Sequence, residues 1–145
     1  MKVTVDKLTP LFNPRSIAVI GASGDLRKAE YIVFRNLVEN SKRLLGYKVY
    51  PINPYAKRIL GVKAYPSITK IEEDIDLAVV VVPAERVPLV LKECGEKHVK
   101  VVIILSAGFS EVGNIELEED KRIGTKFGIR ILGPNCLVCL TLIVV

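Results

Sequence analysis

Short apolar runs recur along the chain, and longer stretches of mixed polarity separate them. Five of these runs are Ser16–Ile20, Lys48–Ile52, Leu77–Val82, Val101–Leu105 and Arg130–Leu132. Continuous branched sequences such as LAVVVV at Leu77–Val82 are typical of strands buried on both faces of a parallel sheet. Each run therefore predicts one strand, and Leu137–Val145 is a candidate sixth strand.

Three of the intervening stretches have helical periodicity. Within Ala29–Lys42, apolar side chains recur every four residues, and Val87–Cys94 follows an i, i+3, i+4, i+7 pattern. Ile115–Phe127 has its acidic residues early and its basic residues late, which complements a helix dipole. Each of these stretches predicts a helix.

Strands that alternate with helical stretches of about 10 to 15 residues indicate βαβ units with right-handed crossovers. We therefore expect an α/β fold, a doubly wound parallel sheet of five to six strands in a three-layer αβα arrangement. Residues 1–145 are expected to form a single domain. Residues 1–15 read as a lead-in, in which Leu8, Leu11 and Phe12 dock a short turn.

Composition narrows the class of protein. The net charge is +5, and the basic residues are interspersed with acidic ones, which argues against a nucleic-acid-binding stripe. There is no signal-peptide pattern and no apolar run near the roughly 20 residues that a membrane span needs, so we expect a cytoplasmic protein without membrane partners. Gln and Trp are absent while Lys and Glu are plentiful, a bias seen in hyperthermophiles.

The unusual loops all follow the predicted strands. They are Gly21–Gly24, Pro51–Pro54, Pro83–Ala84, Ser106–Ser110 and Gly133–Cys136. Ligands of open α/β sheets bind outside the carboxyl ends of the strands. The distribution of these loops therefore predicts a ligand crevice at that edge.

The first two loops indicate what kind of ligand to expect. Gly21 and Gly24 allow a tight turn and close approach of backbone N–H groups to an anion, although the spacing is G-x-x-G rather than G-x-G-x-x-G. After the second strand, Asn53 and Pro54 stand where an NAD-binding domain usually has a carboxylate, and Lys57 follows. These residues fit the 3′-phospho-ADP of coenzyme A or the 2′-phosphate of NADP.

Other reactive residues do not form a catalytic set. His98 is the only histidine and lies in a polar turn at the opposite end of the sheet, so we expect neither a histidine-based metal site nor Ser-His catalysis through Ser23 or Ser106. Cys136 and Cys139 form a C-x-x-C that lacks the second pair of a zinc site. No catalytic residue is assigned.

Several motifs together resemble a known family. They include Asn13–Ser23, Tyr50–Pro54, Gly61–Ser67, Ser106–Phe109 and Gly133–Cys136. These motifs are similar to the N-terminal CoA-binding, Rossmann-like domain of ADP-forming acetyl- or acyl-CoA synthetase α subunits, within the succinyl-CoA synthetase α-like superfamily. The resemblance covers about residues 8 to 137.

The resemblance implies coenzyme A as the cofactor, bound along the strand ends. Gly21, Ala22, Ser23 and Gly24 would face its phosphates, and Asn53, Pro54 and Lys57 would lie near the 3′-phosphate. Val82, Pro83, Ser106, Ala107, Gly108 and Phe109 would line the pantetheine path, with Asn135 and Cys136 near the reactive end. An ATP-grasp β subunit and a separate second α domain are the implied partners, and a homo-oligomer is possible.

Two departures from the family pattern bear on function. Glu30 stands where the family usually has a glycine near the first helix, which would place a carboxylate beside the phosphate site. The motif at Gly133–Cys136 continues into Leu137–Val145 rather than into the second domain that carries the family's phosphorylated histidine. We therefore expect CoA or acyl-CoA binding without turnover by this chain alone. The alternatives are an NADP-dependent oxidoreductase or sensor domain, and a non-binding subunit remnant that acts as an interaction module.

Overall fold

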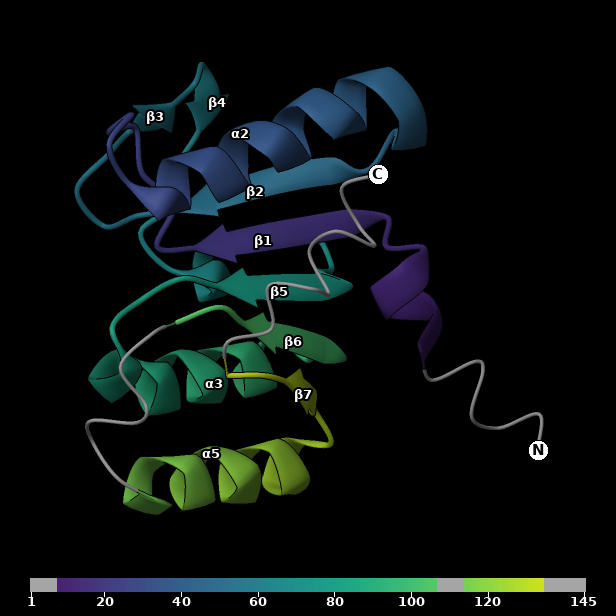
Figure 1. The fold of residues 1–145 in the computed structure, drawn as a ribbon. Coiled ribbons are helices and arrows are strands. Elements are labelled where there is room, and N and C mark those ends of the chain that lie inside the picture. Colours follow the sequence, from purple (N-terminus) through teal and green to yellow (C-terminus); the bar gives the residue numbers. More distant parts are fainter. Residues whose placement is uncertain (1–7, 107–113, 135–145) are drawn as a thin grey trace.

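The chain folds around a five-stranded parallel sheet. The structure is a computed structural model that describes residues 8–106 and 114–134. The strands are β1 (Ser16–Ile20), β2 (Lys48–Ile52), β5 (Leu77–Val80), β6 (Val101–Ile104) and β7 (Arg130–Leu132). They lie in the order β2-β1-β5-β6-β7, and every neighbouring pair is parallel (Figure 1).

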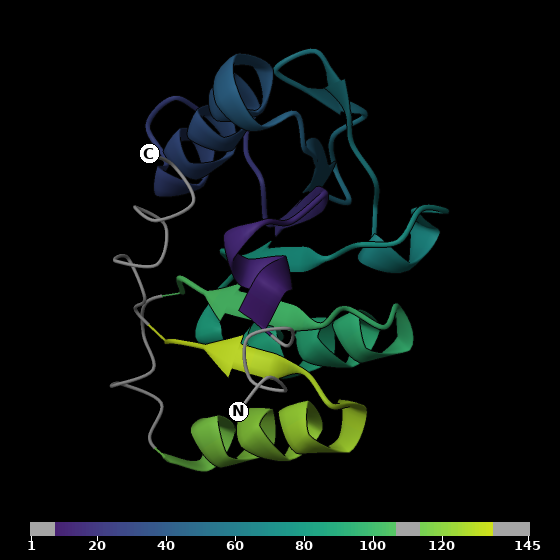
Figure 2. The same ribbon diagram turned by 90° about the vertical axis from the view of Figure 1, so that its right-hand side faces the viewer.

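Helices cover both faces of this sheet (Figures 1 and 2). Helix α2 (Ala29–Asn40) packs on one face, where Phe34 and Leu37 join a core with Ile17 and Val19 of β1. Helices α3 (Val87–Glu96) and α5 (Asn114–Phe127) pack on the other face. Both faces of the central strands are therefore buried, which explains their uninterrupted apolar sequences. The expected α/β, doubly wound, three-layer αβα architecture is confirmed, with five strands in the parallel sheet of the described part of the chain.

Several boundaries differ from the expectations. Strand β5 ends at Val80 rather than Val82, because the chain turns at Pro83 into a short 3-10 helix, Ala84–Arg86. Helix α2 ends at Asn40 and continues as one π-helical turn, Ser41–Leu45. The candidate sixth strand at Leu137–Val145 lies outside the described residues.

A small hairpin was not expected from the sequence. Strands β3 (Arg58–Ile59) and β4 (Val62–Lys63) pair antiparallel across Leu60 and Gly61, and both turn residues have positive φ. This is the backbone of a type I′ turn, which usually needs Asn or Gly at both positions. The sequence did not predict this turn, because Leu60 stands at a position of positive φ that leucine rarely adopts.

The lead-in is helical over residues 8–12, and its docking was only partly as expected. Leu11 is buried and Leu8 packs against the same core, but the Phe12 side chain is 64% exposed, so its predicted docking was wrong. No helix among the described residues is long and apolar enough to cross a bilayer.

Candidate functional site

A crevice opens at the carboxyl edge of the sheet, where the arrowheads of Figure 1 point. It encloses about 230 Å³ between the ends of β1, β2 and β5. The residues expected at the site that line it are Gly21, Asn53, Pro54, Val82 and Pro83. The chain leaves β1 over one face of the sheet and β5 over the other, so the crevice lies at the topological switch point, where open α/β sheets bind ligands.

Gly21 forms the turn at the base of this crevice. Its φ is +93°, and its N–H donates to the carbonyl of Ile52 at 3.0 Å, which ties the end of β1 to the end of β2. A Cβ at this position would overlap the carbonyl oxygen of Val81 at the end of β5. Glycine is therefore required for the three strand ends to meet closely.

Asn53 connects the first two loops. Its side-chain Nδ2 donates to the carbonyl of Ala22 at 2.9 Å, and its Oδ1 accepts from the backbone N–H of Tyr55 at 2.8 Å. Its backbone N–H donates to the carbonyl of Tyr65 at 2.9 Å. The side chain thus holds the Gly21–Gly24 loop against the loop after β2, which is a positioning role.

The remaining expected residues fall into two groups. Ala22, Ser23, Gly24, Lys57 and Ser106 are described but do not line the crevice itself. Ala107, Gly108, Phe109, Asn135 and Cys136 lie outside the described residues. Within the first group, Ser23 accepts a hydrogen bond from the Asp25 N–H at 3.1 Å, which shapes the turn, and Lys57 is exposed on the loop before β3.

Ser106 has an unusual environment. It follows β6 at the same edge of the sheet and is only 4% exposed. Its hydroxyl has no hydrogen-bond partner among the residues that the structure describes. Buried polar groups in native proteins nearly always have a partner, so this hydroxyl is an exception within the described part of the chain.

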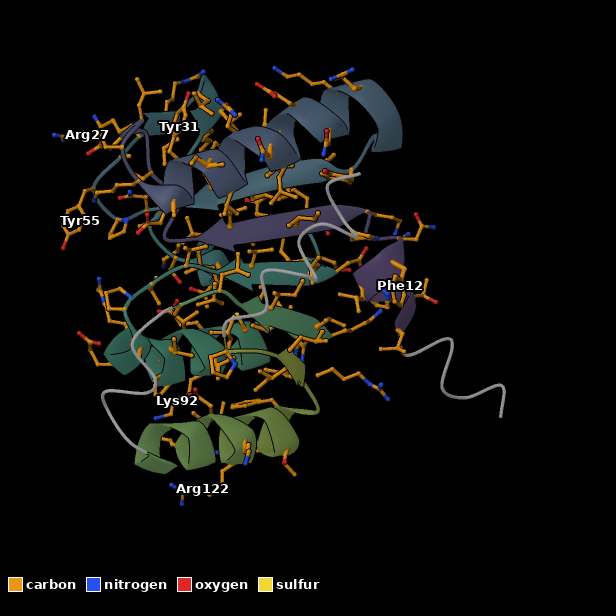
Figure 3. All side chains as sticks on the ribbon, in the orientation of Figure 1. Phe12, Arg27, Tyr31, Tyr55, Lys92 and Arg122 are labelled. Atoms are coloured by element: carbon orange, nitrogen blue, oxygen red, sulfur yellow. The ribbon has the colours of Figure 1, made fainter. Side chains whose placement is uncertain are left out.

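The crevice also contains residues that the sequence reasoning missed. Tyr55 follows Pro54 and lines the opening of the crevice, and it is 90% exposed. Figure 3 shows its side chain pointing away from the sheet. Arg86, Leu89 and Glu93 line the opposite wall. Their i, i+3, i+7 spacing, which runs from the N-cap residue Arg86 into α3, was the available signal, because it places them on one helical face.

The start of α2 adds positive potential near the turn. Lys28 is the N-cap residue, and no side chain caps the helix, so first-turn N–H groups lack a side-chain acceptor. Glu30, on that first turn, lines the crevice, as its departure from the family pattern suggested. Just before the helix, Arg27 forms a bidentate ion pair with Asp25. The hydrogen bonds that the Arg27 side chain donates lower the pKa of the Asp25 carboxyl.

The described residues contain no cluster of three or more histidine, cysteine or acidic side chains that could hold a metal ion. Cys94 lies on the inner face of α3, and burial raises the pKa of its thiol to about 12. A thiol that remains protonated is a poor nucleophile and a poor metal ligand.

Known proteins resemble this chain over most of its length. The family described as CoA binding domain matches residues 15–141. The ADP-forming acetate–CoA ligase of Methanocaldococcus jannaschii is 51% identical over 125 residues, which cover 86% of this chain and 17% of that protein. The α subunit of ADP-forming acetate–CoA ligase II of Pyrococcus furiosus is 50% identical, over 87% of this chain and 27% of that subunit.

Solved structures agree with this family. A protein from Pyrococcus horikoshii OT3 superposes with a TM-score of 0.82 at 49% identity, covering 90% of this chain and 30% of that one. The dinucleotide-forming acetyl-coenzyme A synthetase 1 of Candidatus Korarchaeum cryptofilum superposes with a TM-score of 0.80 at 43% identity, over 88% of this chain and 28% of that one. This chain thus spans less than a third of the length of these relatives. It belongs to the CoA-binding domain family, alongside the corresponding domains of ADP-forming acetate–CoA ligases.

Proposed function

We propose that this chain binds coenzyme A or an acyl-CoA across the carboxyl ends of β2, β1, β5 and β6. The observation that carries the proposal is the crevice at the topological switch point, built on the Gly21 turn, in a chain of the CoA-binding domain family. The proposed role is that of the CoA-binding module of an ADP-forming acid–CoA ligase. The chain has no turnover of its own in this proposal.

The chemistry of the edge fits a long, phosphorylated ligand. The uncapped start of α2 and the loop Gly21–Gly24 favour a pyrophosphate, because backbone N–H groups and the helix dipole both stabilise negative charge. The crevice of about 230 Å³ is smaller than a pocket that encloses a whole drug-sized ligand, so the pantetheine would continue along the open edge. In this proposal the pantetheine passes the end of β6 and accepts a hydrogen bond from the Ser106 hydroxyl, which has no partner among the described residues.

Lys57 distinguishes coenzyme A from NAD. No carboxylate follows β2 to hold free ribose hydroxyls, whereas the exposed ammonium of Lys57 can pair with a phosphorylated ribose. The 2′-phosphate of NADP shares this feature, so NADP remains the second candidate. The family membership of the chain favours coenzyme A.

Domains like this one occur both in short proteins and as part of longer ligase subunits. A conserved protein of Pyrococcus furiosus, 28% identical with a TM-score of 0.70, is covered over 98% of its length, which supports independent folding of a domain of this size. The ligase α subunit of the same organism is much longer than this chain. We therefore propose that residues 1–145 form one domain that binds CoA by itself or beside a second α domain and an ATP-grasp β subunit.

The first test compares coenzyme A with dephospho-CoA, which lacks the 3′-phosphate. We expect Lys57→Glu to weaken CoA binding at least tenfold and to leave dephospho-CoA binding nearly unchanged, because only the former has a charge for Lys57 to pair with. Lys70→Glu makes the same charge change at an exposed site outside the crevice and should weaken neither ligand. Isothermal titration calorimetry measures all six affinities, and equal losses for both ligands would contradict the role of Lys57.

A further inference from the structure

One positively charged side chain lines the crevice at the carboxyl edge, and it comes from the helical segment after β5. Among the described residues that line the crevice, Arg86 is the only Lys or Arg. It is the last residue of the 3-10 helix Ala84–Arg86 and the N-cap residue of α3. Lys57, by contrast, is exposed on the loop before β3 and does not line the crevice. A ligand inside the crevice therefore meets positive side-chain charge at Arg86.

The Arg86 guanidinium takes no part in holding the fold together. Its side chain is exposed and forms no ion pair or hydrogen bond with the other residues that the structure describes. Glu30 and Glu93 supply the two carboxylates of the crevice, and neither is within ion-pair distance of Arg86. Glu93 instead accepts a hydrogen bond from the Ser67 hydroxyl at 3.0 Å. The five N–H donors of the guanidinium thus remain unpaired within the described part of the chain.

Arg86 also stands at an unfavourable position for its own helix. The N-cap position favours Ser, Thr, Asp or Asn, whose side chains accept hydrogen bonds from the first free N–H groups. No side chain makes such a bond at the start of α3, and the helix dipole opposes positive charge there. Arginine therefore does not stabilise the start of α3. A residue that conflicts with local preferences at a ligand crevice is expected where function constrains the sequence.

The balance of charge in the crevice makes this residue decisive for an anionic ligand. Glu30 and Glu93 place two carboxylates on the lining, against the single guanidinium of Arg86. Without Arg86, the charged side chains of the lining would all be negative, and they would repel a phosphate at short range. Arg86 is therefore the side chain placed to offset this repulsion from within the crevice.

We propose that Arg86 binds a phosphate group of the ligand and thereby makes the crevice selective for a phosphorylated nucleotide. This inference rests on the proposed function, in which that nucleotide is the adenosine end of coenzyme A. A planar guanidinium donates two parallel hydrogen bonds to one phosphate, a geometry that an ammonium does not provide. Arg86 follows β5 whereas Lys57 follows β2, so the two cations approach the ligand from different segments of the edge. CoA offers the same phosphate chemistry in its 3′-phosphate and in its pyrophosphate.

The test measures binding of CoA to the whole chain by isothermal titration calorimetry. Arg86→Gln should weaken CoA binding about tenfold or more, because hydrogen bonds between two charged groups are lost. Arg86→Lys keeps the charge without the bidentate geometry and should weaken binding about threefold. Arg122→Gln, the same change at an exposed site on α5 outside the crevice (Figure 3), should alter binding less than about twofold. Thermal unfolding should show no loss of stability in Arg86→Gln, because the change removes a cation from the positive end of α3.

Dephospho-CoA, which lacks the 3′-phosphate, identifies the group that Arg86 binds. An unchanged affinity for dephospho-CoA in Arg86→Gln would assign Arg86 to the 3′-phosphate, and equal losses for both ligands would assign it to the pyrophosphate. CoA binding to Arg86→Gln within about twofold of the unmodified chain would overturn the inference and leave the proposed function standing.

Adenosine 3′,5′-bisphosphate separates this inference from the proposed function. If the unmodified chain binds this nucleotide but not CoA, and Arg86→Gln weakens that binding about tenfold, the role of Arg86 stands while the CoA proposal fails. If the chain binds neither ligand, both proposals are overturned.

Discussion

Two buried serines show how differently one side chain can function in this fold. Ser16, at the amino edge, donates to the carbonyl of Asp74 at 2.7 Å and accepts from the Asp76 N–H at 3.0 Å. Ser106, at the carboxyl edge, is as deeply buried but has no hydrogen-bond partner among the described residues. The first hydroxyl is satisfied by two backbone groups, whereas the second has no partner within the described part of the chain.

Replacing each serine by alanine should have different effects on stability and on CoA affinity. Ser106→Ala should leave the free energy of unfolding unchanged or raise it, because it removes an unsatisfied buried group, and should weaken CoA binding by about three- to tenfold. Ser16→Ala should lower the free energy of unfolding by about 1–3 kcal/mol, because two backbone groups lose their partner, and should leave CoA affinity intact. Urea denaturation and calorimetry measure both quantities. Loss of stability in Ser106→Ala would show that its hydroxyl is already satisfied.

The two glycines of the first loop make different contributions. Gly21→Ala should destabilise the protein by about 1–3 kcal/mol, because its positive φ disfavours a side chain and a Cβ would overlap the Val81 carbonyl oxygen. A Cβ at Gly24 would meet no atom within 4 Å, so Gly24→Ala should change stability by less than about 0.5 kcal/mol. We expect Gly24→Ala to weaken CoA binding, since the methyl group would lie where the phosphates approach. An unchanged affinity for CoA would move the phosphates away from this loop.

At the scale of elements, the periodicity of apolar residues predicted most of the helices and strands. The five strands and three helices follow from apolar runs and helical spacing, because both faces of the sheet are buried. The β3–β4 hairpin could not be predicted, since Leu60 occupies a position that glycine or asparagine normally takes. The sequence prediction placed the ligand site only in the loops that follow the strands. It therefore did not include Arg86 and Glu93, which line the crevice from the helical segment after β5.

Helix α2 supplies a further prediction, because its first turn carries Glu30 beside the crevice. Glu30→Gln should raise CoA affinity about threefold at low salt, since it removes repulsion between two negative charges. The same change should lower the free energy of unfolding by about 0.3–1 kcal/mol, because an acidic residue stabilises a helix N-terminus. Calorimetry at two salt concentrations and urea denaturation measure these effects.

The matched control for this change lies at the other end of the same helix. Glu39 is paired with Arg35 at 3.8 Å, and Glu39→Gln should leave CoA affinity unchanged. A rise in affinity in the control would mean that net charge, rather than the position of Glu30, governs binding. An unchanged CoA affinity in Glu30→Gln would indicate that the phosphates bind away from the start of α2.

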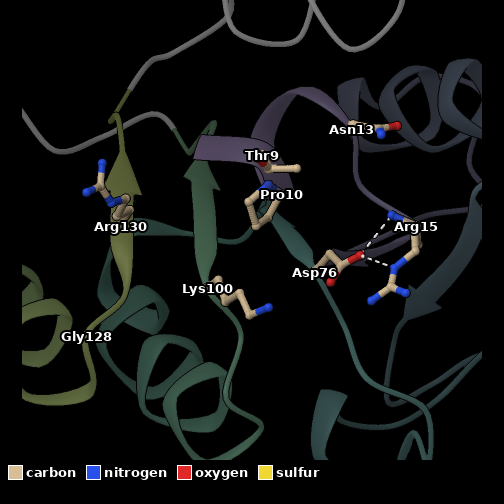
Figure 4. A pocket seen from close by; sticks show the side chains of 8 residues that line it. All are labelled: Thr9, Pro10, Asn13, Arg15, Asp76, Lys100, Gly128 and Arg130. Carbon is tan, nitrogen blue, oxygen red and sulfur yellow. Dashed lines mark hydrogen bonds and ion pairs between the residues drawn. The ribbon is translucent and has the colours of Figure 1, made fainter. Parts of the chain in front are cut away.

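At the scale of the whole molecule, the sheet separates two chemically different edges. The carboxyl edge holds the glycine turn, the unsatisfied Ser106 hydroxyl and the mixed charges of Glu30, Arg86 and Glu93. The amino edge has a cavity of its own, whose lining includes the cations Arg15, Lys100 and Arg130 and the carboxylate of Asp76 (Figure 4). The sequence predicted the first edge because unusual loops follow strands there. It could not predict the second, since those cations come together only through the strand order β2-β1-β5-β6-β7.

The most direct test of the central claim is a calorimetric titration of the chain with CoA, NADP⁺ and NAD⁺ under identical conditions. We predict micromolar binding of CoA and no measurable binding of either dinucleotide. NAD⁺ is disfavoured because the site lacks the ribose-binding carboxylate of NAD domains, and NADP⁺ because the chain belongs to the CoA-binding family. Binding of NADP⁺ in preference to CoA would contradict the proposed function and favour an oxidoreductase or sensor domain. No measurable binding of any of the three ligands would also contradict the proposed function, and would favour a module that interacts only with other proteins.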